Sequence, residues 1–403
     1  MRSKSTTTTR RNLLSAAAAT PLLASAAAAS RKTESKPSAE VYSRIGVKPI
    51  INGMGTVTVL GGSLMAPEVI QAMNEAARHF VQLPDLQRKV GARIAELLNV
   101  PAAMVTCGAA SGIAIAAAAC ISRGNPQRHE QMPDTAGIPH EVIQQKAHRS
   151  GYEHQMRIQG AKIVWVETAE EVARAVSAKT AMMFFLNKND PDGKIKWQEW
   201  VALARKHNVP SFNDAAADVP PKENLWKYVQ GGFDLVAFSG GKGLRGPQAS
   251  GLLLGRKDLI DAAHTCMSPA GGVGRGMKVG KEEMIGVLAA LELFLQTDHD
   301  AVARELDRRI DDMKATLAKV PGLELSREIP GIANAVPHLR IRWDESRLGR
   351  NAQAVLQQLR EGDPAIHLLG GGAGNLMVSV WMMKGLEHKL VAQRLASALS
   401  GKA

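Results

Sequence analysis

Cysteine and aromatic residues are scarce in this sequence, and their scarcity excludes several kinds of site. The chain of 403 residues has three cysteines, Cys107, Cys120 and Cys266. Their odd number and wide spacing predict no disulfide framework and no Cys-x-x-Cys metal pair, and we expect no bound metal. Cys107 and Cys120 stand in apolar surroundings, where buried, unreactive thiols are the expected state. Aromatic residues make up 4% of the chain, and the basic residues are scattered rather than interleaved with them, so no nucleic-acid partner is expected.

A long hydrophobic run is also missing from the N-terminus, where the apolar stretch is short and rich in alanine. This argues against a permanent membrane anchor. The pair Arg10-Arg11 precedes that stretch, and small residues suited to A-x-A cleavage follow it near Ala26 or Ala29. The pattern is typical of a bacterial twin-arginine export signal, whose pathway carries folded proteins. We expect residues 1–29 to be that signal and the protein to be periplasmic, without stable membrane association. A disordered basic tail or an uncleaved anchor is the alternative.

Acidic residues are absent from the same 29 positions, which carry four basic residues. Removing them lowers the formal charge from +12 to about +8. A mildly basic mature protein of this kind would attract acidic substrates or surfaces.

The rest of the chain predicts two domains after an extended arm. Residues 30–66 are predicted to be a polar linker and a glycine-punctuated arm, followed by helices from Pro67 to Val81 and from Leu86 to Leu98. Short apolar runs then alternate with helical patterns, which predicts an α/β domain over 67–300 with a mainly parallel sheet. The runs are "AAMVTC", "EVIQQ", "AKIVWVE", "TAMMFFL", "VPSFND", "FDLVAF" and "ASGLLLG". Over 301–403 the order of apolar runs and helical patterns changes, which predicts a small α+β domain.

One lysine stands among glycines in "FDLVAFSGGKGLRGPQASGLLLG", residues 233–255. Three interpretations of Lys242 compete. A P-loop needs G-x-x-x-x-G-K-[ST] before a helix, but here Gly243 follows the lysine and the upstream glycine is missing. A lysine on a β-turn is the ordinary meaning of an isolated Gly-Lys-Gly. The third interpretation is a lysine that forms a Schiff base with pyridoxal phosphate (PLP), which needs an accessible amine in an apolar pocket.

Two other segments favour the cofactor. Asp214 ends the apolar run in "VPSFNDAAADVPP", at a strand end where open α/β sheets bind ligands, and its carboxylate would keep a pyridine nitrogen protonated. The small Ala216 would let the ring lie against the backbone. In "TCGAASGIAIAAAA" a glycine turn leads into a helix whose N-terminal N–H groups and Ser111 hydroxyl suit a phosphate. Ser239, three residues before Lys242, adds a second hydroxyl. For Asp214 the alternative is a helix or turn cap.

Seven segments resemble a known family. They are "GVKPIINGMGTVT", "TCGAASGI", "QKAHRSGYEHQMRIQGAKIV", "DAAADVPP", "DLVAFSGGKGLRGPQASGLLLGRKDLI", "GRGMKVGKEE" and "LREGDPAI". With them the chain, from residue 44 to 398, resembles the fold-type I PLP enzymes of the selenocysteine synthase and D-glucosaminate-6-phosphate ammonia-lyase group. The resemblance implies a seven-stranded, mainly parallel sheet, a small α+β C-terminal domain, and a homodimer or higher homo-oligomer. Trp381 departs from the family, which often has proline there.

Carried over by position, the resemblance implies that Lys242 binds PLP and that Asp214 contacts the ring nitrogen. It implies that His148, in "KAHRSGY", stacks over the ring; a satisfied polar residue at a strand-to-helix turn is the alternative. The implied phosphate contacts are Ala109, Ala110, Ser111 and Ser239. In the glycine-rich loop "PAGGVGRGMKVGKEE", Arg275 and Lys278 are candidates to bind a substrate anion, from a loop that would reach a neighbouring subunit. Solvated loop charges are the alternative.

Further substrate-binding candidates lie beside the lysine and in the outer parts of the chain. Arg245 follows the lysine closely and would face the site. Arg340 and Arg342 alternate on one strand and so share a face. Arg340 would clamp a substrate carboxylate, although a solvated sheet face is the commoner meaning. Asn52 and Thr56, on the arm, would line the entrance.

These residues predict a PLP-dependent enzyme that acts at the α-carbon of an amino acid, with Lys242 as the base. The resemblance favours α,β-elimination of the ammonia-lyase type from a hydroxylated or phosphorylated amino acid. Racemisation, aldol cleavage and transamination are the alternatives. A non-catalytic periplasmic binding protein on the same fold is the hypothesis from another class, but such a protein would not need both Lys242 and Asp214. Selenium transfer on tRNA is not expected, because export would separate the protein from tRNA and no RNA-binding domain or basic-aromatic surface is evident.

Overall fold

The computed structural model describes residues 40–401. The expected export signal and most of the polar linker lie outside these residues. The short helix α2 (Glu40–Ser43) belongs to one compact unit, and the chain from Ile50 onward forms a second unit with two hydrophobic cores. No helix within residues 40–401 combines the length and apolar character needed to cross a membrane.

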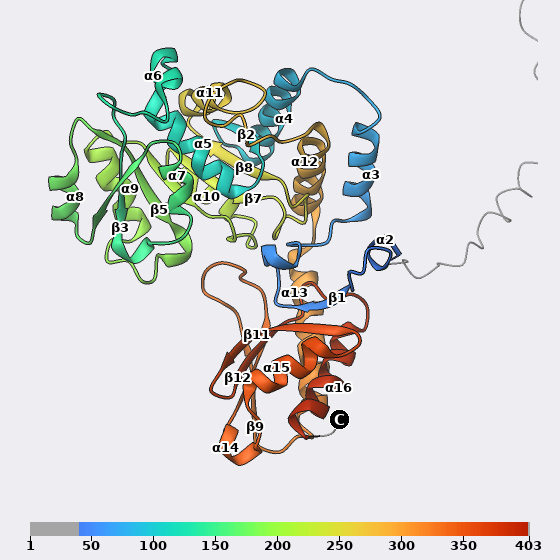
Figure 1. The fold of residues 1–403 in the computed structure, drawn as a ribbon. Coiled ribbons are helices and arrows are strands. Elements are labelled where there is room, and N and C mark those ends of the chain that lie inside the picture. The colour runs from blue at the N-terminus through green and yellow to red at the C-terminus, as the bar shows by residue number, and fades with distance from the viewer. Residues whose placement is uncertain (1–39, 402–403) are drawn as a thin grey trace, which may run out of the picture. The chain divides into compact units, whose positions relative to one another are not determined.

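The first core surrounds a seven-stranded sheet in the order β2-β8-β7-β6-β5-β3-β4 (Figure 1). Its strands are β2 (Ala102–Thr106), β3 (Glu141–Gln145), β4 (Lys162–Val166), β5 (Thr180–Leu186), β6 (Ser211–Asp214), β7 (Leu235–Ser239) and β8 (Gly251–Gly255). The pairs β3–β4, β3–β5, β5–β6 and β6–β7 are parallel, and β8 is antiparallel to both β2 and β7. The predicted mainly parallel sheet is confirmed.

The strands are apolar runs because the sheet is covered on both faces. All seven residues of β5, "TAMMFFL", are buried, as expected for a parallel strand with helices on both sides. The antiparallel pair of β7 and β8 is joined directly by the glycine-rich segment 240–250, so the lysine loop is the connection of a hairpin.

Helix α5 lies at the centre of the large domain and contacts β2, β5, β6, β7 and β8. Every residue of α5 except Ala110 is buried, which fits a helix that is apolar all round. Helices α7 and α11 pack on it from outside. The helices of this domain are α3 (Pro67–Ala76), α4 (Leu83–Leu98), α5 (Ala109–Ser122), α6 (Pro126–Gln131), α7 (Glu153–Arg157), α8 (Ala169–Ala175), α9 (Trp197–Lys206), α10 (Asn224–Gln230), α11 (Lys257–Cys266) and α12 (Lys281–Gln296).

The second core belongs to a small domain with a five-stranded sheet in the order β1-β11-β12-β10-β9. Its strands are β1 (Ile50–Gly53), β9 (Leu323–Glu328), β10 (His338–Trp343), β11 (Ala365–Gly372) and β12 (Asn375–Ser379), and its helices are α13 (His299–Leu317), α14 (Glu345–Leu348), α15 (Ala352–Glu361) and α16 (Glu387–Leu399). Helices α13, α15 and α16 pack together on this sheet (Figure 1).

Part of the predicted N-terminal arm belongs to this small sheet. Strand β1 pairs in parallel with β11, with Ile51 opposite Ile366 in the small-domain core. Downstream of β1 the arm continues through a short 3₁₀ turn, Thr58–Leu60, to the start of α3. The arm therefore connects the small sheet to the large domain.

Candidate cofactor site

The glycines around Lys242 are required by close packing of the hairpin loop. A methyl group at Gly241 would come within 2.5 Å of Cα of Gln248, and one at Gly243 within 1.9 Å of the carbonyl oxygen of Val219. Neither space accepts a side chain, so glycine lets the loop fold tightly against its neighbours. The side chain of Lys242 is half-buried in this packed loop.

Lys242 and Asp214 influence each other, as the sequence predicted for a cofactor site. Asp214 ends β6 and is 4% exposed, and burial raises the pKa of its carboxyl group to about 6. The N–H of Ala216, 3.1 Å from Oδ1, and the charge of Lys242 oppose this rise. Burial lowers the pKa of the Lys242 amine, and the charges of Asp214 and Asp218 act against that shift. A carboxylate and an accessible amine therefore lie together at one strand end.

The N-terminus of α5 fits a phosphate group. The first helical bond of α5 runs from the N–H of Gly112 to the carbonyl of Gly108, so the N–H groups of residues 109–111 make no bond within the helix. The Ser111 hydroxyl is buried and has no hydrogen-bond partner among residues 40–401. An anion at this point would satisfy a polar atom that is otherwise costly to bury.

Strand register places the phosphate end and the lysine end on the same edge of the sheet. Gly251 of β8 lies opposite both Thr106 of β2, which leads into α5, and Ser239 of β7, which leads into the lysine loop. The two ends are therefore separated by one strand, roughly 10 Å. The N–H of Ser239 also donates to the carbonyl of Ala216 at 3.3 Å, linking the end of β7 to the Asp214 segment. The predicted cofactor contacts converge here, and His148 lies close by, since its ring accepts from the N–H of Leu186, which pairs with Asp214.

His148 is held by contacts with the protein on both ring nitrogens and on its ring edge. Its ring is fully buried in a short 3₁₀ turn, and its centroid lies 4.4 Å from that of Phe185 in an edge-on contact. The N–H of Leu186 donates to Nδ1 at 3.2 Å, and the amide of Gln145 lies 3.4 Å from Nε2. Burial lowers the pKa of His148 to about 4. These contacts favour the alternative, a satisfied polar residue at a strand-to-helix turn.

Asp218 is a second acidic residue at the site, which the sequence analysis did not single out. It is 2% exposed, and burial raises its pKa to about 6. The amide of Asn187 donates to its carboxylate and lies 2.8 Å from Oη of Tyr228. The available signal was an acidic residue four positions after Asp214 in "DAAADVPP", but spacing alone does not show that a loop folds back.

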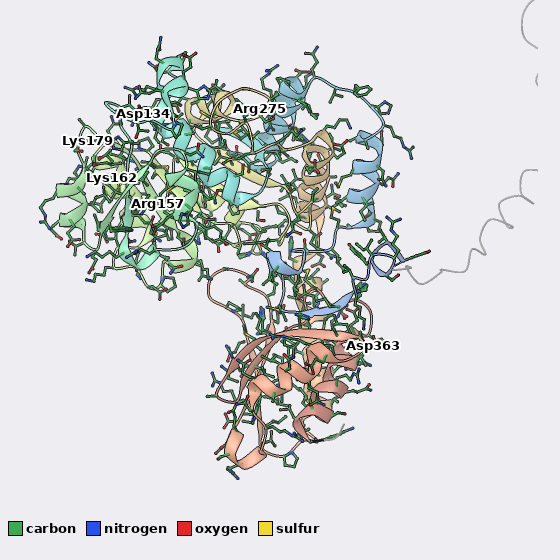
Figure 2. The ribbon with its side chains drawn as sticks, in the orientation of Figure 1. Asp134, Arg157, Lys162, Lys179, Arg275 and Asp363 are labelled. Atoms are coloured by element: carbon green, nitrogen blue, oxygen red, sulfur yellow. The ribbon has the colours of Figure 1, made fainter. Side chains whose placement is uncertain are left out.

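Arg275 and Lys278 are not brought to Lys242 within one chain. Both are exposed, and the guanidinium of Arg275 donates to the hydroxyl of Ser268 at 3.1 Å. The loop packs on the flank of α5, where a methyl group at Gly274 would meet Ile115, and Figure 2 shows Arg275 beside α11. A different cation, the exposed Lys188 after β5, is near enough to lower the pKa of Lys242.

The outer candidates are occupied by contacts of their own. Arg340 donates to Glu328 at 2.8 Å and to Asn375 at 3.1 Å within the small sheet, which favours the sheet-face alternative over a substrate clamp. The amide of Asn52 donates to the carbonyl of Gly55 at 2.9 Å, and so shapes a turn of the arm. Thr56 is buried, and its hydroxyl donates to Asn334 at 2.9 Å.

Arg245 points from the lysine loop toward the arm, with Nε 2.9 Å from the carbonyl of Leu64. It lines a cavity of about 820 Å³ together with Gly243, Leu244 and Trp381 of the small domain. Trp381, the residue that departs from the family pattern, thus lies beside the lysine loop. Among residues 40–401 no group of three or more His, Cys, Asp or Glu side chains is arranged to hold a metal ion.

Known proteins resemble this chain in sequence and fold. The model of the L-seryl-tRNA selenium transferase family matches residues 168–353. D-glucosaminate-6-phosphate ammonia lyase of Salmonella typhimurium is 33% identical over 338 residues, 81% of this chain and 88% of that protein. The 5'-C-glycyluridine monooxygenase-decarboxylase of a Streptomyces species is 32% identical over 340 residues, 81% and 83% of the two chains. A solved structure of D-glucosaminate-6-phosphate ammonia-lyase superposes with a TM-score of 0.78 and 32% identity, covering 90% of this chain and 98% of that one.

Proposed function

Because the chain belongs to the family of fold-type I PLP enzymes that includes D-glucosaminate-6-phosphate ammonia lyase, we propose that it eliminates a β-substituent from an amino acid. The chain is a PLP-dependent enzyme. Its relatives support a reaction at the α-carbon of an amino acid. The substrate proposed here is a small amino acid with a hydroxyl or phosphate leaving group at the β-carbon. The leaving group departs as water or inorganic phosphate, and hydrolysis of the resulting enamine, through its imine tautomer, gives a keto acid and ammonia.

Each residue of the site has a distinct part in this proposal. PLP, when bound, withdraws electrons from the α-carbon and so makes its proton acidic. Asp214 would hold a proton on the pyridine nitrogen, because the positive charge on that ring would stabilise the ionised carboxylate that burial alone disfavours. The N–H groups of residues 109–111 and the hydroxyls of Ser111 and Ser239 would hold the phosphate.

Lys242 would carry the substrate's α-proton. Burial lowers the pKa of its amine, so a larger share is neutral, and able to accept a proton, than for an exposed lysine. The exposed Lys188 and Arg245 are the cations of this region that lie nearest in space or sequence to Lys242, and we propose Lys188 as a contact for the substrate carboxylate.

The observation that carries the proposal is that a half-buried lysine just after β7 and the buried Asp214, at the C-terminal end of the neighbouring strand β6, shift each other's pKa. The test is an absorbance spectrum of the purified protein with PLP, before and after borohydride, beside the variant Lys242→Ala. We expect a visible band of lysine-bound PLP that borohydride bleaches and that the variant lacks. Release of ammonia and a keto acid from β-hydroxylated amino acids then identifies the reaction. A wild-type protein without this band would favour a binding protein instead.

A second candidate is oxygen-dependent decarboxylation of an amino acid. One observation favours it: the chain is 32% identical to a monooxygenase-decarboxylase, nearly the same as its 33% identity to the ammonia lyase. The two reactions are separated by measuring O₂ and CO₂. Decarboxylation consumes O₂ and releases CO₂ with each turnover, whereas elimination proceeds at the same rate in the absence of oxygen.

We also propose that the enzyme works in the periplasm as a homo-oligomer. The twin-arginine pattern of residues 1–29 supports export in folded form. The exposed glycine-rich loop with Arg275 and Lys278 supports a site shared between subunits, since one chain leaves these cations away from its own lysine.

A further inference from the structure

The buried carboxylate of Asp218 interacts with both domains. The large domain contributes the amide of Asn187, which donates to Oδ2. The small domain contributes Ala333, which lines the same cavity of about 270 Å³ as Asp218. The backbone N–H of Ala333 opposes the rise in the pKa of Asp218. Because this side chain is 2% exposed, removal of either partner would weaken the hydrogen bonding of a buried acceptor.

The segment that carries Ala333 is attached to the large domain and the arm at two further points. The N–H of Asn334 donates to the carbonyl of Ala217 at 2.8 Å, and the Asn334 side chain accepts from Thr56 at 2.9 Å. Ala333 and Asn334 have φ angles of 55° and 48°. Such left-handed backbone is uncommon for an alanine and persists only where the surroundings hold it. The conformation of residues 331–334 therefore depends on these contacts.

Asp218 also acts on the lysine of the cofactor site. Val219, the residue after Asp218, packs so closely on Gly243, the residue after Lys242, that a methyl group at Gly243 would come within 1.9 Å of the Val219 carbonyl oxygen. The charge of Asp218 opposes the lowering of the pKa of Lys242, whereas the charge of Lys188 adds to it. The chain folds back between the two acids, since the N–H of Asp218 donates to the carbonyl of Ala215 at 3.0 Å. The other titratable groups that influence Asp218, or that it influences, are Asp214 and Tyr228.

We propose that Asp218 is a positioning residue that couples the docking of residues 331–334 to the charge of the Lys242 amine. The docked segment supplies the Ala333 N–H, which favours the ionised carboxylate. The ionised carboxylate in turn favours the protonated lysine. When the segment leaves, the carboxylate loses a donor, and the lysine loses part of the charge that supports its protonated form. The inference rests on the proposed function, which makes Lys242 the cofactor lysine.

The first test follows the segment in the PLP-free full-length protein. Hydrogen exchange at the Asn334 amide reports docking, because this N–H is bonded to Ala217. The variant Asp218→Asn should raise its exchange rate about tenfold, the effect of weakening one charge-assisted hydrogen bond. The matched control is Asp190→Asn, since Asp190 lines the same cavity of about 270 Å³ but bonds to Trp197 instead. The control should leave the exchange rate unchanged. An equal rate in Asp218→Asn and wild type overturns the proposal.

The second test follows the lysine. In lysine-bound PLP the Lys242 nitrogen is part of the linkage, and the absorbance band changes when that nitrogen gains or loses a proton. The band is titrated with pH in wild type, Asp218→Asn and Asp190→Asn. Loss of the Asp218 charge should move the midpoint to lower pH, while the control stays at the wild-type midpoint. A purely structural role would not move this midpoint, so an unchanged value in Asp218→Asn overturns the coupling.

A third variant covers the case in which Asp218→Asn does not fold. Thr56→Val removes the donor to Asn334 and leaves Asp218 in place. It should raise the Asn334 exchange rate and move the titration midpoint in the same direction by a smaller amount. Faster exchange with an unmoved midpoint overturns the coupling. A wild type without the PLP band, by contrast, would contradict the proposed function, while the exchange test would still report on the Asp218 contact.

Discussion

The indole of Trp381 lies against Gly243, the residue that follows Lys242, and a methyl group at Gly243 would come within 3.3 Å of its Cη2. Trp381 belongs to the small domain and Gly243 to the lysine loop of the large domain. The small domain thus contacts the backbone directly beside the amine. Trp381, where the resemblance led us to expect proline, therefore lies next to Lys242, and it lines the cavity of about 820 Å³.

The contact at Gly243 predicts a sharp effect of Gly243→Ala. The new methyl group would overlap the Val219 carbonyl oxygen at 1.9 Å, and displacement of that backbone should cost about 1–3 kcal/mol of unfolding free energy. We expect a lower thermal midpoint and a weakened PLP band. Gly271→Ala is the control, because nothing lies within 4 Å of its added methyl group. Equal midpoints for the two variants would show that the loop can relax.

The orphan hydroxyl of Ser111 predicts an effect on cofactor affinity without a loss of stability. Removing a donor to a phosphate should weaken PLP binding about tenfold or more, measured by titration of the absorbance band. The PLP-free protein should unfold at the wild-type temperature or above, because the hydroxyl has no partner to lose. Ser122→Ala, in the last turn of the same helix, is the control and should bind PLP normally. Wild-type affinity in Ser111→Ala would place the phosphate elsewhere.

The raised pKa of Asp214 predicts a dependence of stability on pH. In the unfolded chain this group ionises near 3.8 and in the folded chain near 6, so between these values the folded state binds more protons and its stability falls as pH rises. In the variant Asp214→Asn, position 214 does not ionise, so it makes no contribution to the fall in stability with rising pH. Relative to wild type, the PLP-free variant should therefore gain up to about 3 kcal/mol between pH 4 and pH 7. Denaturant unfolding at both pH values measures it, and a constant difference would mean that the acid is not desolvated.

His148 distinguishes a structural role from ring stacking. His148→Phe keeps an aromatic ring but loses the acceptor for the Leu186 N–H, which should cost about 1–3 kcal/mol. The PLP band should keep its wavelength, because the ring contacts Phe185 in the core. A shifted band with unchanged stability would instead support the stacking that the sequence predicted.

Export can be tested on the arginine pair outside the described residues. Replacement of Arg10 and Arg11 by lysine should leave the protein in the cytoplasmic fraction, whereas wild type should be recovered from the periplasm. Fractionation with immunodetection measures both. Periplasmic recovery of the double variant would argue for a different route.

The sequence predicts the large domain well because its signals are local. Buried parallel strands are continuous apolar runs, and each stood out between helical patterns. Asp214 and Lys242 could be paired because both follow such runs directly. The predicted helix from Pro67 extended to Val81, but α3 ends at Ala76. The following residues up to Val81 are exposed, so the apolar Phe80 and Val81 did not mark a buried helix face.

Features set by long-range contacts escape the sequence. Strands β9 and β11 were not predicted, because β9 is polar and partly exposed and β11 ends in glycines. The pairing of Arg340 with Glu328 depends on the register of two strands. The hydrogen bond between Thr56 and Asn334 joins residues 278 positions apart, and no local pattern announces it. For the same reason the sequence did not predict a role for Asp218, which depends on its contacts with Asn187 and Ala333.

Helix α5 makes the predicted phosphate site rigid, which the reaction alone does not require. Its residues are buried on all sides except Ala110, so the helix cannot shift without disrupting the core of the large domain. The N–H groups of residues 109–111 and the Ser111 hydroxyl, which would bind the phosphate, are consequently held in place whether or not the cofactor is present. Removal of PLP should leave a rigid phosphate site at the N-terminus of α5. The PLP-free enzyme should therefore bind PLP again on simple mixing, without refolding.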